Sequence, residues 1–304
     1  KPMTHDVWEG RQIMAAAQKH GRIVQTGVQR RSDPKWLRAI NRLREGVIGD
    51  VYMARAIVFK SDRRDALPEA PPKPAPKWLD WNLWQGPAQT REYCDNYVHY
   101  NWHWFWDYGN GEIGNQGLHQ IDAAMWGLDK GLPVRVYSSG GRYTYKDQGE
   151  TPNTQLATYT YADGTEMVVE VRNRWTNGEA DTRVGNLFYG SEGYFVEADQ
   201  GHNKFAFYNK NDSIVRDDKD ALPDSKGPFG NFIKAVHSRK QEDVSATVED
   251  GHRAAVHAHI ANISYRLGRS LRFDPAQEVF VDDSEANAML KRTYREGFVL
   301  PELG

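Results

Sequence analysis

Apolar side chains near the start of the chain recur at the spacing of a helix. The run extends from Val7 to Ala17, follows a capping residue at Thr4 or Asp6, and stops at Gly21. Residues 23–28 then form a short, β-branched, apolar stretch of the kind found in buried parallel strands. A helix followed by such a strand predicts the end of an α/β unit.

A second helix is predicted to begin at Asp33 and Pro34, with Leu37 and Ile40 on its apolar face. We expect residues 33–50 to connect two domains. From Val51 onward the pattern changes to that of strands. The predicted strands span residues 51–59, 134–145, 154–161, 165–174, 185–189, 194–198 and 204–208.

Strands that are segregated from helices indicate an α+β layer. Asp163 and Gly164 separate two strand-like runs, which predicts an antiparallel hairpin. Five prolines crowd residues 61–77, so this stretch is predicted to be a loop. Helices are predicted again at residues 229–237, 248–267 and 284–295.

Composition narrows the class of protein. The chain has 39 basic and 41 acidic residues, and its net charge of -2 offers no field that would attract nucleic acid or anionic lipid. Cys94 is the only cysteine, so no internal disulfide can form. No stretch approaches the roughly 20 apolar residues of a membrane-spanning helix, so neither nucleic acid nor a membrane is an expected partner.

The first residues, from Lys1 to Asp6, contain no initiating methionine and lead directly into a helical pattern. We interpret the N-terminus as a truncation within a domain. These residues do not resemble a signal peptide, and the localisation of the protein stays undecided.

The densest group of chemically useful side chains lies between residues 97 and 122. Leu118 and Ile121 recur at helical spacing, which predicts a helix over residues 115–126 with an apolar buried face. Asn115, His119 and Asp122 would then share the opposite face. A neutral histidine accepts the proton of a hydroxyl while hydride leaves the same carbon, so His119 is the main catalytic candidate. The alternative is a structural histidine that hydrogen-bonds to the backbone near the start of the helix.

Two other patterns in this region match motifs for dinucleotide or metal binding, but both matches are weak. The run from Gly109 to Gly114 matches G-x-G-x-x-G, but no buried strand precedes it, so we interpret it as a tight turn into the helix. His99, His103 and Asp107 are spaced four apart and would meet on one face of a helix, although the segment could equally be extended. Aromatic residues that line a pocket would explain this segment equally well, and we predict no metal site.

Four motifs, taken together and in order, carry a resemblance to a known family. They are Lys1-Pro2, the stretch from Gln25 to Arg31, the stretch from Gly46 to Val51, and Asn115-x-x-x-His119-x-x-Asp122. Together they resemble the Gfo/Idh/MocA family, named for glucose-fructose oxidoreductase, inositol dehydrogenase and a rhizopine-catabolism protein. The resemblance covers nearly the whole chain.

The resemblance implies an α/β remnant of a Rossmann domain at residues 1–32. An α+β domain with a large, mainly antiparallel open sheet would follow at residues 33–304, and the open sheet would support a homo-oligomer. Lys1 would be the lysine of a Glu-Lys-Pro motif that contacts the nicotinamide side and the reacting hydroxyl. The glutamate and the glycine-rich phosphate loop would lie upstream of the sequence, so we expect the chain alone not to bind NAD or NADP tightly.

The implied site residues fall into three groups. The catalytic group is Lys1, His119 and Asn115; the substrate group is Asp122, His103, Trp102, Trp106 and Arg172; the cofactor group is Lys1, Pro2, Gln29 and Arg30. Asn115 departs from the family, which has aspartate at this position. An amide hydrogen-bonds to a hydroxyl but holds no negative charge.

The resulting hypothesis is an NAD- or NADP-dependent enzyme that oxidises a secondary alcohol of a sugar, glycoside or cyclitol. Two alternatives stay open. One is NAD-dependent glycoside cleavage within the same family, and the other is a non-catalytic sugar-binding homologue, which the departure at Asn115 would favour.

Overall fold

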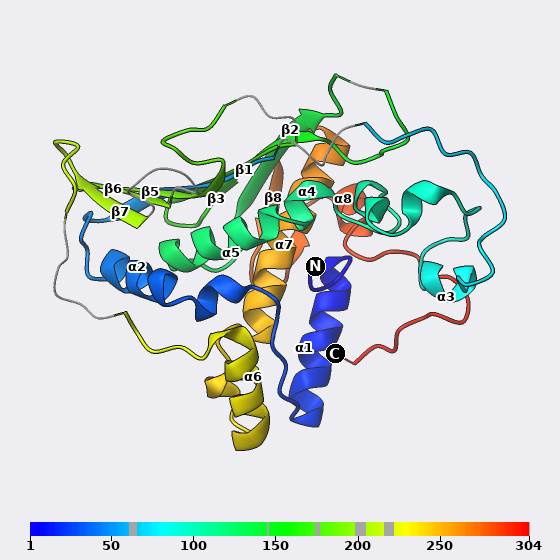
Figure 1. Ribbon diagram of the computed structural model, residues 1–304, viewed down its shortest axis with the longest axis horizontal. Coiled ribbons are helices and arrows are strands. Elements are labelled where there is room, and N and C mark those ends of the chain that lie inside the picture. The colour runs from blue at the N-terminus through cyan, green and yellow to red at the C-terminus, as the bar shows by residue number, and fades with distance from the viewer. Residues whose placement is uncertain (61–65, 145, 174–176, 198–204, 216–221, 304) are drawn as a thin grey trace.

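A nine-stranded mixed sheet is the main layer of the protein, and helices cover one of its faces (Figure 1). The computed structural model describes residues 1–60, 66–144, 146–173, 177–197, 205–215 and 222–303. The strand order is β7-β6-β5-β1-β4-β3-β2-β8-β9. The strands are β1 (Val51–Phe59), β2 (Arg135–Gly141), β3 (Thr154–Thr160), β4 (Glu166–Arg172), β5 (Val184–Gly190), β6 (Gly193–Glu197), β7 (Phe205–Asn209), β8 (Leu271–Asp274) and β9 (Val279–Phe280).

Most neighbouring strands pair in the antiparallel sense, as predicted. β1 and β4 are parallel, with Ala56 opposite Val169. The hairpin predicted at Asp163 and Gly164 is confirmed, because β3 and β4 pair directly around it. Gly164 has a φ of 87°, a left-handed conformation that glycine adopts without a steric cost.

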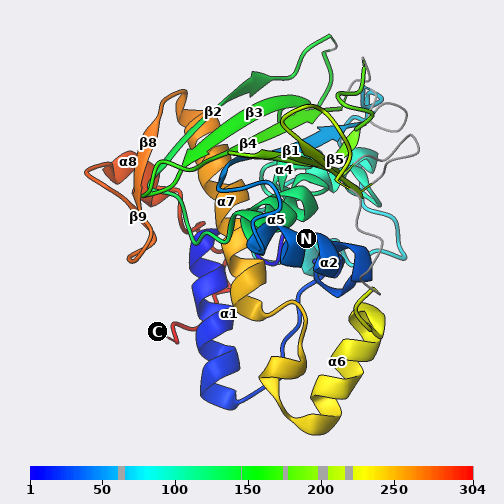
Figure 2. The same ribbon diagram turned by 90° about the vertical axis from the view of Figure 1, so that its left-hand side faces the viewer.

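Helices pack on one face of the sheet, while the other face carries loops (Figure 2). α5 crosses β1, β4 and β5, and α7 lies between α5, α1 and β2. Ile121 and Met125 of α5 join Ala56, Val169 and Phe188 of the strands in the main core. The helices are α1 (Val7–His20), α2 (Pro34–Arg44), α3 (Trp81–Gln85), α4 (Gly111–Gly114), α5 (Gly117–Leu128), α6 (Gly227–Ser238), α7 (Val248–Leu267) and α8 (Ser284–Ala288).

Local sequence explains why the long helices begin and end where they do. Asp6 accepts a hydrogen bond from the amide of Glu9 at the start of α1. Thr247 and Asp250 form a complete capping box at the start of α7, and Gly268 ends that helix in a left-handed conformation. No helix in the described part of the chain is long and apolar enough to cross a membrane.

Two predicted elements differ from the structure. Residues 23–28 are not a strand, and the amide of Thr26 donates to the carbonyl of Ala246 in a loop contact. A strand needs a neighbour to complete its hydrogen bonds, and no described strand lies beside this segment. The helix predicted at residues 284–295 ends at Ala288.

Residues 66–77 form a loop, as predicted, and residues 61–65 lie outside the described residues. Four predicted strand ends, at Tyr145, Arg174, Ala198 and Lys204, also lie outside them.

Candidate active site

Lys1 and His119 form the chemical centre of the candidate site, although they are 118 positions apart. The Nζ atom of Lys1 lies 2.8 Å from Nε2 of His119. His119 belongs to the first turn of α5, and 6% of its surface is exposed. The other ring nitrogen, Nδ1, is buried and has no hydrogen-bond partner among the described residues.

The surroundings keep His119 uncharged. Burial and the positive charges of Lys1, Arg30 and Lys60 lower its pKa to about 3. The imidazole is therefore neutral at pH 7. Because the Lys1 ammonium donates to Nε2, that nitrogen is an acceptor and the ring proton is at Nδ1. A neutral imidazole beside an ammonium can take a proton from a hydroxyl and stabilise the oxygen that remains.

Asn115 does not share a helical face with His119 and Asp122, so this prediction is wrong. α4 ends at Gly114, and Asn115 lies in the break before α5 with φ and ψ of -95° and -94°. Its side-chain amide donates to Oε2 of Glu112 at 3.3 Å. The chain leaves helical geometry at Asn115, so the spacing rule that joined the three residues does not apply to it.

Asp122 is held in an ion pair inside the protein. Its carboxylate oxygens lie 2.9 and 3.1 Å from Nε of Arg31, and the side chain is fully buried. Arg31 also lies 3.1 Å from Asp250 at the start of α7. Burial raises the pKa of Asp122 to about 6, against the opposing effect of Arg31. The pair joins α5 to the segment before α2 and leaves no exposed carboxylate for a substrate.

The residues predicted to contact the cofactor have different surroundings. Pro2 packs beside Gly114, next to the Lys1 and His119 pair. Gln29 is exposed on a 3₁₀ helix, Gln29–Ser32. Arg30 donates to Asn186 and Glu197 at 2.8 and 2.9 Å, and its charge contributes to the lowered pKa of His119.

The aromatic segment before α4 is packed largely on itself. The ring of Trp102 stacks on His103 at a centroid separation of 3.8 Å, and Nδ1 of His103 lies 2.5 Å from the carbonyl of Tyr100. Trp106 lies beside Arg266, whose guanidinium carbon is 5.3 Å from the ring centroid. Trp102, His103 and Trp106 therefore lie in one segment, which packs on itself and against Arg266 of α7.

Arg172 lies on the opposite face of the sheet from α5. Its neighbour Val171 belongs to the core beneath the helices, and side chains alternate between the two faces of a strand. Arg172 pairs with Glu170 at 3.0 Å and Glu179 at 3.4 Å, and it covers the ring of Phe59. The structure therefore separates Arg172 from the Lys1 and His119 pair.

Within the glycine-rich run, Gly109 and Asn110 lead directly into the short helix α4, Gly111–Gly114. A Cβ atom on Gly109 would lie 2.6 Å from the backbone of His103, and one on Gly114 would lie 2.5 Å from Asn110. Backbone and side-chain atoms therefore pack directly against these two glycines. Within the described ranges, no three His, Cys, Asp or Glu side chains come together to hold a metal ion.

Two residues near the pair were not predicted. Lys60 follows the last residue of β1 and donates to Gln116 at 2.9 Å, and its charge acts on His119. Glu112 is fully buried and accepts from Asn115. The position of Lys60 at the end of a buried strand was a usable signal, whereas no local pattern marked Glu112.

Comparison with known proteins identifies the family. The model of an oxidoreductase family, C-terminal alpha/beta domain, matches residues 65–300. The chain belongs to the Gfo/Idh/MocA oxidoreductase family. The resemblance found in the sequence is thereby confirmed. A comparison with curated proteins gave no match.

Solved structures of other oxidoreductases share the fold at low sequence identity. The WlbA dehydrogenase from Bordetella pertussis, in complex with NADH and UDP-GlcNAcA, is 15% identical with a TM-score of 0.65, and the match covers 90% of this chain and 70% of that one. An aldose-aldose oxidoreductase from Caulobacter crescentus, complexed with glycerol, is 14% identical with a TM-score of 0.63 and the same coverage.

Proposed function

We propose that this member of the Gfo/Idh/MocA family transfers a hydride between NAD or NADP and a secondary alcohol of a sugar, glycoside or cyclitol. Residues 1–32 would close the dinucleotide-binding domain, and residues 33–304 would form the substrate domain. The observation that carries the proposal is the 2.8 Å contact between Lys1 and a neutral, buried His119. The NADH and sugar ligands of the structural relatives support the choice of reactants.

The chemistry assigned to the pair balances as an alcohol oxidation. A hydroxyl held between the Lys1 ammonium and the His119 ring gives its proton to Nε2. The ammonium stabilises the oxygen while negative charge develops on it. A nicotinamide bound beside Lys1 would supply the acceptor for the hydride of the carbinol carbon. The reverse sequence reduces a ketone.

We base the fit of the cofactor on its nicotinamide end. Lys1 lies beside His119 and Pro2 beside Gly114, and both would flank the nicotinamide. Arg30 supplies positive charge nearby but is already paired with Glu197. The close packing at Gly109 and Gly114 argues against the glycine-rich run as the seat of the phosphates. We therefore assign the nicotinamide end to the Lys1 segment.

The direct test is a panel of sugars, glycosides and cyclitols offered to the full-length protein with NAD or NADP. We expect reduction of the cofactor at 340 nm in proportion to a ketone product. Release of a free aglycone without net reduction would instead indicate glycoside cleavage. The absence of both signals with every member of the panel would contradict the proposal.

Replacing the proposed base tests the assignment of roles. His119→Ala should lower turnover by roughly 100-fold to 10,000-fold, the usual loss for a general acid or base, while cofactor binding changes little. His20→Ala is a matched control, because His20 is exposed at the end of α1. Nearly full activity in His119→Ala would overturn the assignment.

We also propose that the face of the sheet without helices packs against a second copy of the chain. Tyr137 and Leu156 are 45% and 41% exposed on this face, and the rings of Tyr194 and Tyr208 stack on each other there. Exposed apolar side chains on a broad sheet are typical of interfaces. Contact with a second copy would bury these exposed side chains.

Sedimentation velocity tests this interface. Leu156→Glu should shift an oligomer toward monomer, because it introduces a charge at the centre of the buried surface. Leu83→Glu, at an exposed position on α3, is the control and should not change the oligomeric state. A wild-type protein that sediments as a monomer at all concentrations would contradict this proposal.

A further inference from the structure

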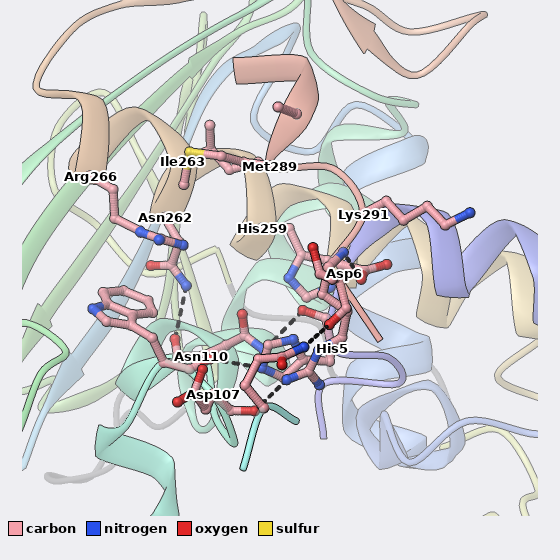
Figure 3. A pocket seen from close by; sticks show the side chains of 15 residues that line it. His5, Asp6, Asp107, Asn110, His259, Asn262, Ile263, Arg266, Met289 and Lys291 are labelled. Carbon is pink, nitrogen blue, oxygen red and sulfur yellow. Dashed lines mark hydrogen bonds between the residues drawn. The ribbon is translucent and has the colours of Figure 1, made fainter. Parts of the chain in front are cut away.

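A cavity lies beside the segment that follows Lys1, where His5 and Asp6 line it. It has a volume of about 320 Å³ and lies between the C-terminal half of α7, the residues after α8, and the stretches that contain His5 and Asp107 (Figure 3). The described residues that line it include neither Lys1 nor His119. The volume is at the lower end of the range for small-molecule sites.

The carboxylates on the wall of this cavity already accept hydrogen bonds from other groups. Asp6 accepts the backbone amides of Glu9 and Arg292 at 2.8 and 2.9 Å. Asp107 accepts from the guanidinium of Arg91 at 3.1 Å. These contacts reduce the repulsion that either carboxylate would exert on an anionic ligand.

One guanidinium in the cavity is available to a ligand. Arg266 projects from α7 over the ring of Trp106, at 5.3 Å from its centroid. No hydrogen bond or ion pair joins Arg266 to another described residue. By contrast, Lys291 lies 2.9 Å from Glu302. A guanidinium forms its strongest hydrogen bonds with a carboxylate, through two parallel N–H donors.

One imidazole in the cavity supplies an acceptor. The ring of His259 projects from α7 toward His5 and Asp6, and only 4% of the residue is exposed (Figure 3). Its backbone hydrogen bond is to Thr4, and Nε2 is buried without a partner among the described residues. Burial lowers the pKa of His259 to about 3, so the ring is neutral and Nε2 can accept a hydrogen bond from a ligand.

We propose that this cavity binds a small hydroxylated carboxylate, such as a sugar acid. Its carboxylate would pair with Arg266, and a hydroxyl would donate to Nε2 of His259. A ligand with acceptors alone, such as a fully ionised anion, would leave Nε2 unsatisfied, whereas a neutral polyol would leave the guanidinium unsatisfied. The site is separate from the Lys1 and His119 pair and does not depend on the proposed reaction.

Calorimetry with D-gluconate tests the recognition. D-glucitol lacks the carboxylate and acetate lacks the hydroxyls, so both should bind at least about tenfold more weakly than D-gluconate. Arg266→Gln should weaken D-gluconate binding by about tenfold to one-hundredfold, the effect of losing hydrogen bonds to a charged group. Arg253→Gln is the matched control, because Arg253 is exposed on the same helix outside the cavity, and should bind as the wild type does.

The ¹⁵N resonances of the histidine rings locate the ligand in the wild-type protein, without any substitution. D-gluconate should shift the ¹⁵N resonance of Nε2 of His259 and leave that of His119 unchanged, and His259→Gln should weaken binding. A shift confined to His119 would place the ligand at the proposed reaction site and overturn the second site. Equal affinity for D-gluconate, D-glucitol and acetate, no detectable binding, or unchanged affinity in Arg266→Gln would also overturn it.

Discussion

At the scale of the residue, the break at Asn115 decides what this side chain can do. Asn115 is 6% exposed and donates to the buried carboxylate of Glu112. The amide therefore donates to a buried carboxyl group at the position where the family carries an aspartate. The amide complements Glu112, which a second carboxylate would repel.

Asn115→Asp should consequently destabilise the fold rather than only change the basicity of His119. Loss of the hydrogen bond to Glu112 and the repulsion between two buried carboxylates should lower the free energy of unfolding by about 1–3 kcal/mol at pH 8. The loss should shrink toward pH 5, because protonation of one carboxyl removes the repulsion. Urea unfolding at both pH values measures this difference. Asn115→Ala removes the hydrogen bond without adding a charge, so its loss should depend much less on pH.

At the scale of the element, the position of α5 on the sheet depends on a close approach to β5. Gly127 faces this contact, and a Cβ atom there would overlap the ring of Phe188 and lie 3.2 Å from Leu43. Phe188 is fully buried, so its ring cannot move into solvent. The contact holds the helix whose first turn carries His119.

Gly127→Ala should therefore lower the free energy of unfolding by about 1–3 kcal/mol through overpacking, despite the better helix propensity of alanine. Gly131→Ala is the control, because no other atom lies within 4 Å of the position of its Cβ. Thermal unfolding of both variants measures the effect. A Gly127→Ala protein as stable as the control would show that the α5 contact can relax.

At the scale of the whole molecule, buried histidines link stability to pH. Burial lowers the pKa of His5, His119 and His259 to about 3 and that of His257 to about 4, whereas an unfolded histidine titrates near 6.5. The contribution of these histidines to the free energy of unfolding is fully present above pH 6.5. It is lost as pH falls toward 4, because the unfolded chain binds protons first. Burial raises the pKa of Asp122 to about 6 and that of Glu197 to about 7, which opposes this trend.

Four histidines lose stability below pH 6.5, and the raised pKa values of Asp122 and Glu197, together with the upward shifts of Asp6 and Glu9, offset part of this loss. We therefore expect a net loss of stability between pH 7.5 and pH 5.5. Each histidine contributes about 1.4 kcal/mol for each pH unit below its unfolded pKa. Urea unfolding across this range measures the slope. His257→Gln should flatten it, and His20→Gln, at an exposed position, should not. A protein that became more stable on acidification would contradict the expectation.

The sequence by itself determined the elements whose pattern is local. The helix at Val248–Leu267 and the hairpin at Asp163 and Gly164 follow from side-chain periodicity and turn chemistry, which act over a few residues. The family resemblance also singled out Lys1 and His119. Residues 23–28 show the limit, because a strand-like pattern forms no strand without a neighbour to pair with.

Only the tertiary structure decided which predicted site residues meet. It brought Lys1 to His119 across 118 positions, paired Asp122 with Arg31, and placed Arg172 on the other face of the sheet. It also ended a helix just before Asn115, so that a spacing of four residues no longer implied a shared face. The physical reason is common to these cases: contacts between distant segments depend on how whole elements pack, and no local pattern encodes that packing.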